Sequence, residues 1–425
     1  MKDIHSLTAI NNKEMERNLY YYLIILISIF LNQTSIIGGI NFSLSDLLIP
    51  FLLFFLIYKG IQVPTYHFMY FLFLSVAIVA TAVFYTPYKF GVNLDINLIL
   101  KEYLKLFAVF LYLLAGYNFV HEKAAHVSLK WYSYAALFIG LLGILINVLG
   151  MKFFYQIYDF GEYRYNGFMN DPNYFAIIQI SALPFFFRSK NLSLRTKVII
   201  YFIMVFSILL SGSKTGFITL LLYTMFFVFS KVIKNKFKLK TILFSVSAFV
   251  FFSILGVALQ TIQPNFTLNS DKYVQFQRIF LLFTNFDAAF NDNGSGRLPI
   301  WMAGIHLISL SPLFGVGVGM YSGASEKVSG IGMVAHNTYI QIYSEWGGLF
   351  ATIIFLYIAV VLIQVTFKEK VKNETNFILR DLLIILLIGS IAISLNNARM
   401  FWFFLGVLVY RISGKQLTKL PSHIT

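Results

Sequence analysis

The sequence predicts an all-α fold: a polytopic integral membrane protein with about 12 transmembrane helices and one large external loop. The first reason is composition, because 58% of the residues are hydrophobic, 18% are aromatic and only 12% are charged. Soluble globular domains carry about twice that charged fraction. The second reason is that apolar runs such as 19–31 and 215–233 can cross a hydrocarbon core about 30 Å thick. The third is that basic residues gather in short loops between such runs.

These runs organise the whole chain, residues 1–425, as a single membrane domain. No cleavable signal peptide is expected, because residues 1–17 are charged and polar and no small-residue cleavage site follows the first span. The absence of cysteine excludes disulfides and thiolate metal sites. The spans are expected near 19–31, 44–58, 67–84, 98–119, 131–149, 172–187, 198–210, 215–233, 241–260, 337–366, 379–395 and 399–412.

The net charge of +15 is distributed as the positive-inside rule requires. With the N-terminus in the cytoplasm, 22 of the 33 lysines and arginines fall in cytoplasmic segments, and both termini are cytoplasmic. The densest basic runs, 188–197 and 231–240, then lie in short cytoplasmic loops. The basic excess therefore indicates topology among membrane lipids, and no nucleic acid partner is expected.

Two segments that face outward in this topology are long. Residues 150–171 carry acids, bases and tyrosines, and residues 261–336 form a 76-residue external loop, far longer than a connection requires. Within the large loop, an amphipathic stretch at 273–283 is expected to lie along the membrane surface. Residues 294–321 predict a helix with a tryptophan, followed by a glycine-rich return. We find no internal repeat.

The outer segment "RYNGFMNDPNYFA" (164–176) holds the first candidate residues. Asn-Asp-Pro-Asn is typical of a turn and of a helix start, with Pro172 at the first helical position. That role accounts for Asp171 and for Asn173, which we expect to give structural support. It does not account for Arg164, which is therefore a candidate binding residue.

The short outer loop "SGSKTGF" (211–217) contains the second candidate, Lys214. The loop resembles the end of a phosphate-binding loop, but Ser213 stands where that motif has glycine, and the loop lies between membrane helices, so nucleotide binding is not expected. Serine hydroxyls, backbone N–H groups at a helix start and an ammonium group favour an anion. Alternatively, Lys214 extends to the membrane interface.

The stretch "AHNTYIQIYSEWGGLF" (335–350) opens an apolar helix with polar side chains. Asn337 is the expected N-cap, so the positive end of the helix dipole lies near His336 and favours a neutral imidazole, the state that a proton acceptor needs. Tyr339 and Tyr343 follow on the same face and offer flat surfaces for a sugar ring. Glu345 lies about two and a half turns from His336. It cannot share that face, and we expect it to pin the helix to a neighbouring partner.

A lone arginine in a polar loop is usually solvated, so Arg297 in "GSGRLPIW" is a candidate only together with the other cations. Arg164, Lys214 and Arg297 are outward cations that suit a diphosphate, and His336 is a candidate base at the same membrane face. The chain has no Asp-x-Asp pair and no Cys/His cluster, so no metal and no cofactor are expected. A donor at the external face should be lipid-linked.

These segments resemble the O-antigen polymerase and O-antigen ligase superfamily of bacterial envelope glycosyltransferases. "HNTYIQIYSEWGGLF" is similar to its His-Asn-x-Tyr…Glu-x-Gly signature, and "SGSKTGF" to its Ser-Gly-Ser-Arg-Thr-Gly loop, with Lys214 where arginine is usual. "GRLPIWMAGIHLISLSPLFGVGVGMY" resembles the stretch before the histidine, and "RYNGFMNDPNYFA" the Arg-x-x-Gly…Pro-Asn segment. The resemblance extends over roughly residues 160–350; the first 150 residues match only as hydrophobic spans.

The resemblance implies a metal-independent, inverting sugar transfer at the outer face of the bacterial cytoplasmic (inner) membrane. The implied donor is an undecaprenyl-diphosphate-linked oligosaccharide. Carried over, the three cations bind its diphosphate and His336 is the catalytic base. Lysine at 214 is a departure, because it cannot make arginine's bidentate contact. The remaining assignments are acceptor or sugar positioning by Asn337, Tyr339 and Tyr343, and structural support by Glu345 and Asn173.

Three activities remain open. A polymerase passes the glycan to another lipid-linked repeat and a ligase passes it to lipid A core; the Phe- and Tyr-rich composition, with 47 Phe and 26 Tyr, favours the polymerase. A lipid-linked oligosaccharide flippase is the third, disfavoured by the absent repeat and by the few ionisable groups inside the spans. Control of glycan length is expected to need a separate regulator protein.

Overall fold

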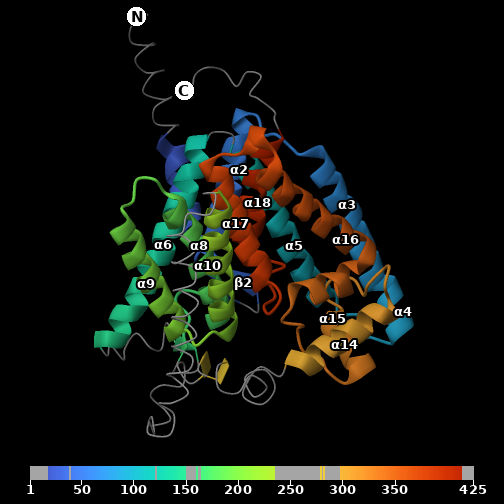
Figure 1. Cartoon of the computed structure of the whole chain (residues 1–425). Coiled ribbons are helices and arrows are strands. Elements are labelled where there is room, and N and C mark those ends of the chain that lie inside the picture. Colours follow the sequence, from blue (N-terminus) through green and yellow to red (C-terminus); the bar gives the residue numbers. More distant parts are fainter. Residues whose placement is uncertain are drawn as a thin grey trace, which may run out of the picture.

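A computed structural model describes residues 18–37, 40–119, 122–149, 159–160, 164–234, 278–279, 281–282 and 297–413. Within these residues the chain is almost entirely helical (Figure 1), which confirms the all-α prediction. Two short antiparallel ribbons were not predicted. In the first, β1 (Ser35–Ile37) pairs with β2 (Ile40–Phe42); in the second, β3 (Asp159–Phe160) pairs with β4 (Arg164–Tyr165).

The helices of the first half begin with Asn18–Phe30 and continue with α2 (Leu44–Lys59), α3 (Thr65–Ala80), a π-helical turn (Thr81–Tyr85), α4 (Thr86–Phe90), α5 (Ile96–Tyr117) and α6 (Glu122–Leu149). Those of the second half are α8 (Pro172–Arg188), α9 (Leu194–Leu210), α10 (Lys214–Lys234), α14 (Arg297–Leu310), α15 (Tyr321–Ser329), α16 (Thr338–Phe367), a 3₁₀ turn (Glu369–Val371), α17 (Glu374–Gly389) and α18 (Arg399–Ile412).

Three helical stretches of the described chain, Thr65–Phe90, Lys123–Leu149 and Thr338–Phe367, are long and apolar enough to cross a membrane. They coincide with the spans expected near 67–84, 131–149 and 337–366. Helices also cover the other expected spans, except that 241–260 lies outside the described residues. A polytopic membrane protein therefore fits the structure, and the number of 12 spans stays a prediction.

Some predicted boundaries are wrong. The helix α6 begins at Glu122, nine positions before the expected start near 131. The span expected at 379–395 ends at Gly389, and turns follow it until α18 begins at Arg399. Apolar residues continue through this turn region, and they gave the impression of a longer helix. The turn is held by the side chain of Thr338, which donates to the Ile393 carbonyl at 2.8 Å and accepts from the Leu395 N–H at 2.7 Å.

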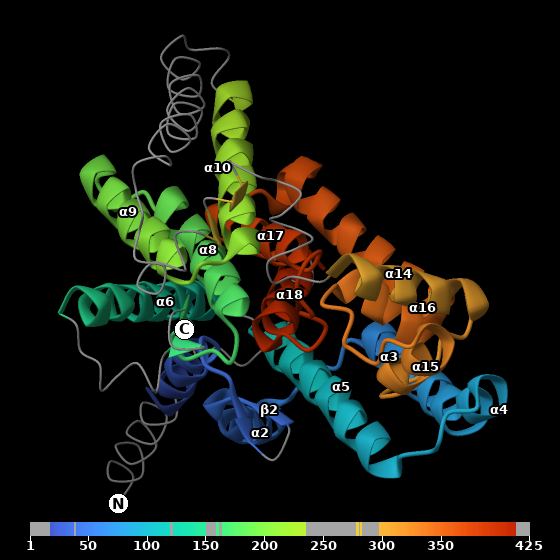
Figure 2. The same cartoon turned by 90° about the horizontal axis from the view of Figure 1, so that it is seen from below.

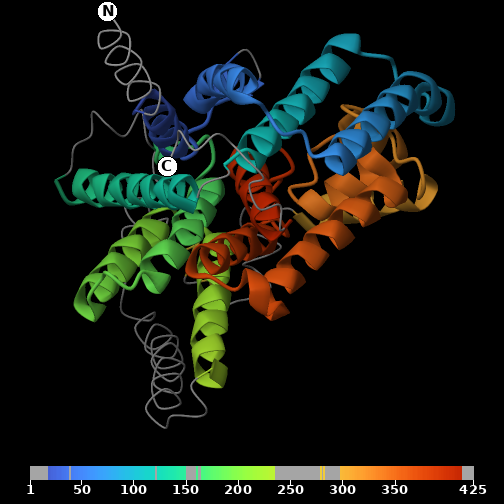
Figure 3. The ribbon, with the colours of Figure 1, turned by 90° about the horizontal axis from the view of Figure 1, so that it is seen from above.

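The helices form two groups that flank a central set. Views from below and from above show α6, α8, α9 and α10 on one side, α3, α4, α14, α15 and α16 on the other, and α5, α17 and α18 between them (Figures 2 and 3). Within this arrangement α8 packs against α6, α9, α10 and α17, and α16 packs against α3 and α14. Candidate site residues lie at the start of α10 and at the start of α14, and the start of α14 is far from α8 in the sequence.

The central helices α5 and α18 pack at backbone distance. A Cβ atom added at Gly116 would lie 2.0 Å from the Phe403 carbonyl oxygen, and one at Gly406 would lie 2.2 Å from that of Leu113. Small residues allow such close packing inside a membrane, where dispersion contacts replace the hydrophobic effect as the main attraction between helices.

The first turns of α16 are braced by the glycine-rich return that the sequence predicts. The Val316 and Gly317 N–H groups donate to the carbonyls of Ser344 and Glu345 at 2.7 and 3.0 Å. Just beyond, Gly347 has φ +74° and ψ 163°, which kinks the helix. The kink was not predicted. Because of it, residues 338–346 pack against the glycine-rich return and do not continue the axis of the rest of α16.

Candidate active site

Arg164 lies where β4, the start of α8 and the loop before α10 meet. Its Nε donates to the Ser211 carbonyl at 2.9 Å, and its Nη2 donates to Asn173 Oδ1 at 3.3 Å. The same Asn173 oxygen accepts from Ser213 Oγ at 2.9 Å. Asn173 therefore connects the arginine to the serine-rich loop.

The expected helix start at 171–173 is confirmed. Asp171 is the N-cap of α8, its Oδ1 accepting from the Asn173 and Tyr174 N–H groups at 2.8 and 3.0 Å, and Pro172 is the first helical residue. This cap satisfies N–H groups that would otherwise lack partners. It also fixes the direction in which the Asn173 side chain leaves the helix.

Lys214 is the first residue of α10, just outside the expected span 215–233. Ser213 precedes Lys214, and the Ser213 Oγ accepts from the Gly216 N–H at 3.0 Å. Arg297, the first residue of α14, donates from Nη1 to Thr215 Oγ1 at 3.2 Å. The structure thus brings Arg297 to the loop that carries Lys214, 83 positions earlier in the chain.

A fourth cation, Arg278, belongs to this cluster and was missed in the sequence. It acts electrostatically on Arg164, Lys214 and Arg297, and its Nε is buried without a hydrogen-bond partner in the described chain. The signal that was available is its position inside the amphipathic stretch 273–283. An arginine on an amphipathic surface stretch has an ordinary role at the lipid headgroups, which is why it did not stand out.

The pKa values in the cluster reflect burial and mutual repulsion. The pKa of Arg164 is lowered to about 10, first by burial and then by Arg278. The pKa of Lys214 is lowered to about 8 by burial and by repulsion from Arg278, Arg297 and Arg164. Burial is also the largest cause of the lowered pKa of Arg297, which Asp171 partly offsets. Cations that repel one another in this way are stabilised by a bound anion.

His336 lies beside this cluster. Its pKa is lowered, mainly by partial loss of hydration and then by the positive charge of Arg297, with Asp171 acting in the opposite sense. The side chain is exposed at the surface and makes no hydrogen bond to the described part of the chain. Its φ of +47° lies in the left-handed region, and it is the one described residue other than glycine with a positive φ. A neutral, accessible imidazole is the form that can accept a proton.

Asn337 is the N-cap of α16, as expected, with its Oδ1 accepting from the Tyr339 and Ile340 N–H groups at 3.0 and 3.1 Å. Tyr339 donates its hydroxyl to the Leu387 carbonyl at 2.8 Å. Tyr339 and Tyr343 both contact the Phe355 ring, with centroids 5.0 and 5.9 Å away. These contacts give all three residues a packing or capping role, and sugar positioning by them stays a prediction.

Glu345 is buried, with 7% of its surface exposed. Its carboxylate accepts from Gln341 Nε2 at 3.2 Å, one turn earlier on the same helix. In the described chain the groups of a neighbouring helix that act on this carboxylate are the charges of Glu102 and Lys105 in α5. Structural support by the Glu345 side chain stays a prediction. The pinning contact comes from its backbone carbonyl, which accepts from the Gly317 N–H.

The assembled groups can hold an anion and accept a proton side by side. Four cations from four separate segments surround one place, and a neutral imidazole lies next to them. Among the residues that the structure describes, no three His, Asp or Glu side chains gather as a metal site would require. Independence from metal stays a prediction for experiment.

The comparison with known families covers most of this site. Residues 199–356 match the sequence model of the Wzy_C family, described as O-antigen ligase. The match includes Lys214, Arg297 and His336, whereas Arg164 and Asn173 precede it. No curated protein gives a significant match to the chain. The chain thus carries a segment, residues 199–356, that matches the Wzy_C family of O-antigen ligases.

Proposed function

We propose that this chain is a polymerase of O-antigen or a related surface polysaccharide. It transfers the growing glycan from undecaprenyl diphosphate to the next lipid-linked repeat unit, at the outer face of the bacterial inner membrane. The observation that carries the proposal is the gathering of Arg164, Lys214 and Arg297 with His336, in a chain that matches a family that transfers lipid-linked glycans.

In this reaction His336 takes the proton of an acceptor hydroxyl while the hydroxyl oxygen attacks the anomeric carbon of the donor sugar. The bond between that carbon and the diphosphate oxygen breaks, and the leaving diphosphate keeps the electron pair. Attack from the side opposite the leaving group inverts the configuration at the anomeric carbon. The guanidinium and ammonium groups stabilise the charge that develops on the diphosphate. Because the chain itself supplies these cations, we expect the reaction to proceed without a metal ion.

A ligase is the second candidate, because the matched family model is described as an O-antigen ligase. It would use the same donor, the same cations and the same base, and would differ only in the acceptor. The aromatic composition favours the polymerase, so the acceptor is the point that an experiment must decide.

The test is reconstitution of the purified full chain in lipid vesicles with the undecaprenyl-diphosphate oligosaccharide as its one substrate and EDTA present. A ladder of lipid-linked multiples supports the polymerase. A donor that stays unextended until lipid A core is added, and then appears on that core, identifies a ligase. Movement of labelled donor across the bilayer with no transfer to either acceptor would identify a flippase and overturn the proposal.

A further inference from the structure

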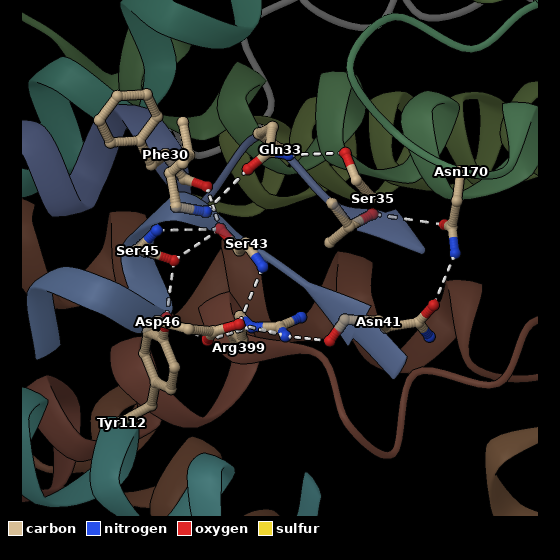
Figure 4. A network of polar contacts seen from close by, with 12 residues as sticks. Phe30, Gln33, Ser35, Asn41, Ser43, Ser45, Asp46, Tyr112, Asn170 and Arg399 are labelled. Atoms are coloured by element: carbon tan, nitrogen blue, oxygen red, sulfur yellow. Dashed lines mark hydrogen bonds and ion pairs between the residues drawn. The ribbon is translucent and has the colours of Figure 1, made fainter. Parts of the chain in front are cut away.

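A polar network ties the first turn of α2 to the first turn of α18 (Figure 4). The two oxygens of Asp46 accept from Arg399 Nε and Nη2 at 2.6 Å each. The Tyr112 hydroxyl, from α5, donates to Asp46 at 2.8 Å, and so does the N–H of Ser43, the N-cap residue of α2. Only 9% of the Arg399 surface is exposed. The carboxylate therefore joins three helices at one largely buried point, where 18% of the Asp46 side chain is exposed.

The network continues from Arg399 into the ribbon β1–β2. Arg399 Nη2 also donates to the Asn41 carbonyl at 2.5 Å, and the Asn41 side-chain oxygen accepts from Asn170 Nδ2 at 2.9 Å. At the other edge of the ribbon, the Thr34 N–H donates to the Phe168 carbonyl at 2.9 Å. Figure 4 shows Asn41 between Arg399 and Asn170. The ribbon thus holds residues 168–170 against the helices.

Residues 168–170 lead directly into the candidate site. Asp171 follows Asn170 and caps α8, and Asn173 is the residue whose side-chain oxygen meets Arg164 and Ser213. Arg164 lies only six positions before Asn170. A displacement of Asn170 would therefore move both residues that frame this side of the site.

The contacts that hold residues 168–170 are needed because the clustered cations repel one another and must be kept in place. Arg164 is held by one hydrogen bond to a backbone carbonyl and a longer one to Asn173, so its place depends on the segment that carries it. A buried ion pair is often no more stabilising than apolar residues of the same volume. Asp46 and Arg399 are therefore better explained by the geometry they impose than by their contribution to stability.

We propose that the Asp46–Arg399 ion pair, acting through the Asn41–Asn170 contact, is a positioning device that fixes Arg164 and Asn173 against the donor diphosphate. The inference rests on the proposed function, and it adds four positioning residues from outside the matched family segment. The positioning device is expected to affect binding of the donor, because Arg164 is one of the cations proposed to bind the donor diphosphate.

The test uses the full chain in vesicles with Asn41→Ala, Asn170→Ala and the double variant, which remove surface amides and leave the buried ion pair intact. Three quantities are measured: KM and kcat for the oligosaccharide donor, the Kd of undecaprenyl diphosphate without sugar, and the melting temperature. We expect each single variant to raise KM and Kd about fivefold, as the loss of roughly one hydrogen bond implies, with little change in kcat or melting temperature. Asn170→Ala also removes the hydrogen bond that Asn170 Oδ1 accepts from Thr34 Oγ1 at 3.3 Å. The double variant should therefore be no worse than Asn170→Ala alone, because both lack the Asn41–Asn170 contact.

Gln33→Ala is the matched control. Gln33 contacts Ser35 and the Leu44 N–H at the base of the same ribbon, both at 2.9 Å, and in the described chain its side chain makes no hydrogen bond to residues 164–173. It should leave KM and Kd unchanged, while Arg399→Lys, which keeps the charge but not the paired contact, should raise both. Unchanged Kd in Asn170→Ala, or additive effects of the two asparagine variants, would overturn the inference. If the unaltered chain transfers no sugar, the proposed function fails, and the Kd values still decide the positioning role.

Discussion

His336 combines a left-handed backbone conformation with an exposed side chain and a lowered pKa. The left-handed region costs a residue with a Cβ atom about 1–2 kcal/mol, so the surroundings must impose it. Such strain is found at functional sites more often than elsewhere. The N-cap at Asn337 and the contacts of Thr338 with the turn after α17 fix the helix start from one side and explain how the strain is held.

The lowered pKa of His336 predicts the acid limb of the pH profile. A base works when it is unprotonated, so kcat/KM for transfer should stay high as the pH falls through 6.5, the ordinary value for histidine, and should drop only below it. The measurement is kcat/KM against pH in vesicles. An acid limb centred above 6.5 would contradict the role of His336 as the base.

Lys214 predicts the alkaline limb of the same profile. Its pKa of about 8 means that the free protein loses this positive charge above that pH, which weakens attraction of the diphosphate and lowers kcat/KM. Lys214→Arg keeps its charge to a much higher pH and should extend activity to alkaline conditions. An alkaline limb that stays in place in Lys214→Arg would show that another group causes it.

Site residues differ in how far the sequence reveals them. Asp171 and Asn337 were predictable as N-caps, because capping depends on a pattern of a few adjacent residues. The ion pair between Asp46 and Arg399 was not, because its members are 353 positions apart and no local pattern links them. Arg278 was missed for a related reason: only the folded chain brings it to Arg164.

At the scale of elements, α16 shows what hydropathy leaves out. Residues 337–366 are apolar enough over their length that the sequence predicts a continuous span, yet Gly347 kinks it. The ribbon β1–β2 was missed because its strands are three residues each, too short for a period-2 pattern to be recognised. Both features come from tertiary contacts, and both position the site.

Gly347→Ala should destabilise the protein and reduce transfer. A Cβ atom there would lie 2.0 Å from the Leu313 carbonyl oxygen, and the φ of +74° is itself unfavourable for alanine. Gly330→Ala is the control, because Gly330 has a φ of +70° with nothing within 4 Å of an added Cβ. We expect the control to cost about 1–2 kcal/mol, the backbone term alone, and Gly347→Ala to cost clearly more in thermal unfolding. Equal losses in the two variants would contradict the packing described for the kink.

At the scale of the whole molecule, the spans were predictable because hydropathy accumulates over about 20 residues. The arrangement of the helices was not, since α5 and α18 meet through single glycines at Gly116 and Gly406 that no periodicity marks. The gathering of the cations depends on that arrangement. Charge patterning also predicts which face of the membrane each loop occupies, and this prediction can be measured directly.

The natural sequence has no cysteine, so single cysteines can report its topology. Lys327→Cys, near the end of α15 in the predicted external loop, should react with a membrane-impermeant maleimide on intact cells. Lys190→Cys, in the predicted cytoplasmic loop after α8, should react only after permeabilisation, although its side chain is 87% exposed. Labelling of both residues from outside, or of Lys190→Cys alone, would contradict the orientation that puts the site on the outer face.

The most direct test of the central claim compares His336→Ala with His306→Ala in the vesicle assay with EDTA. His306 is an exposed histidine on α14 whose side chain has no hydrogen bond in the described chain, so it controls for the loss of an imidazole as such. The predicted result is that His336→Ala forms no product while its abundance and melting temperature match those of the unaltered chain, and that His306→Ala retains transfer. Near-normal product from His336→Ala would contradict the assignment of this site as the place where the glycan is transferred.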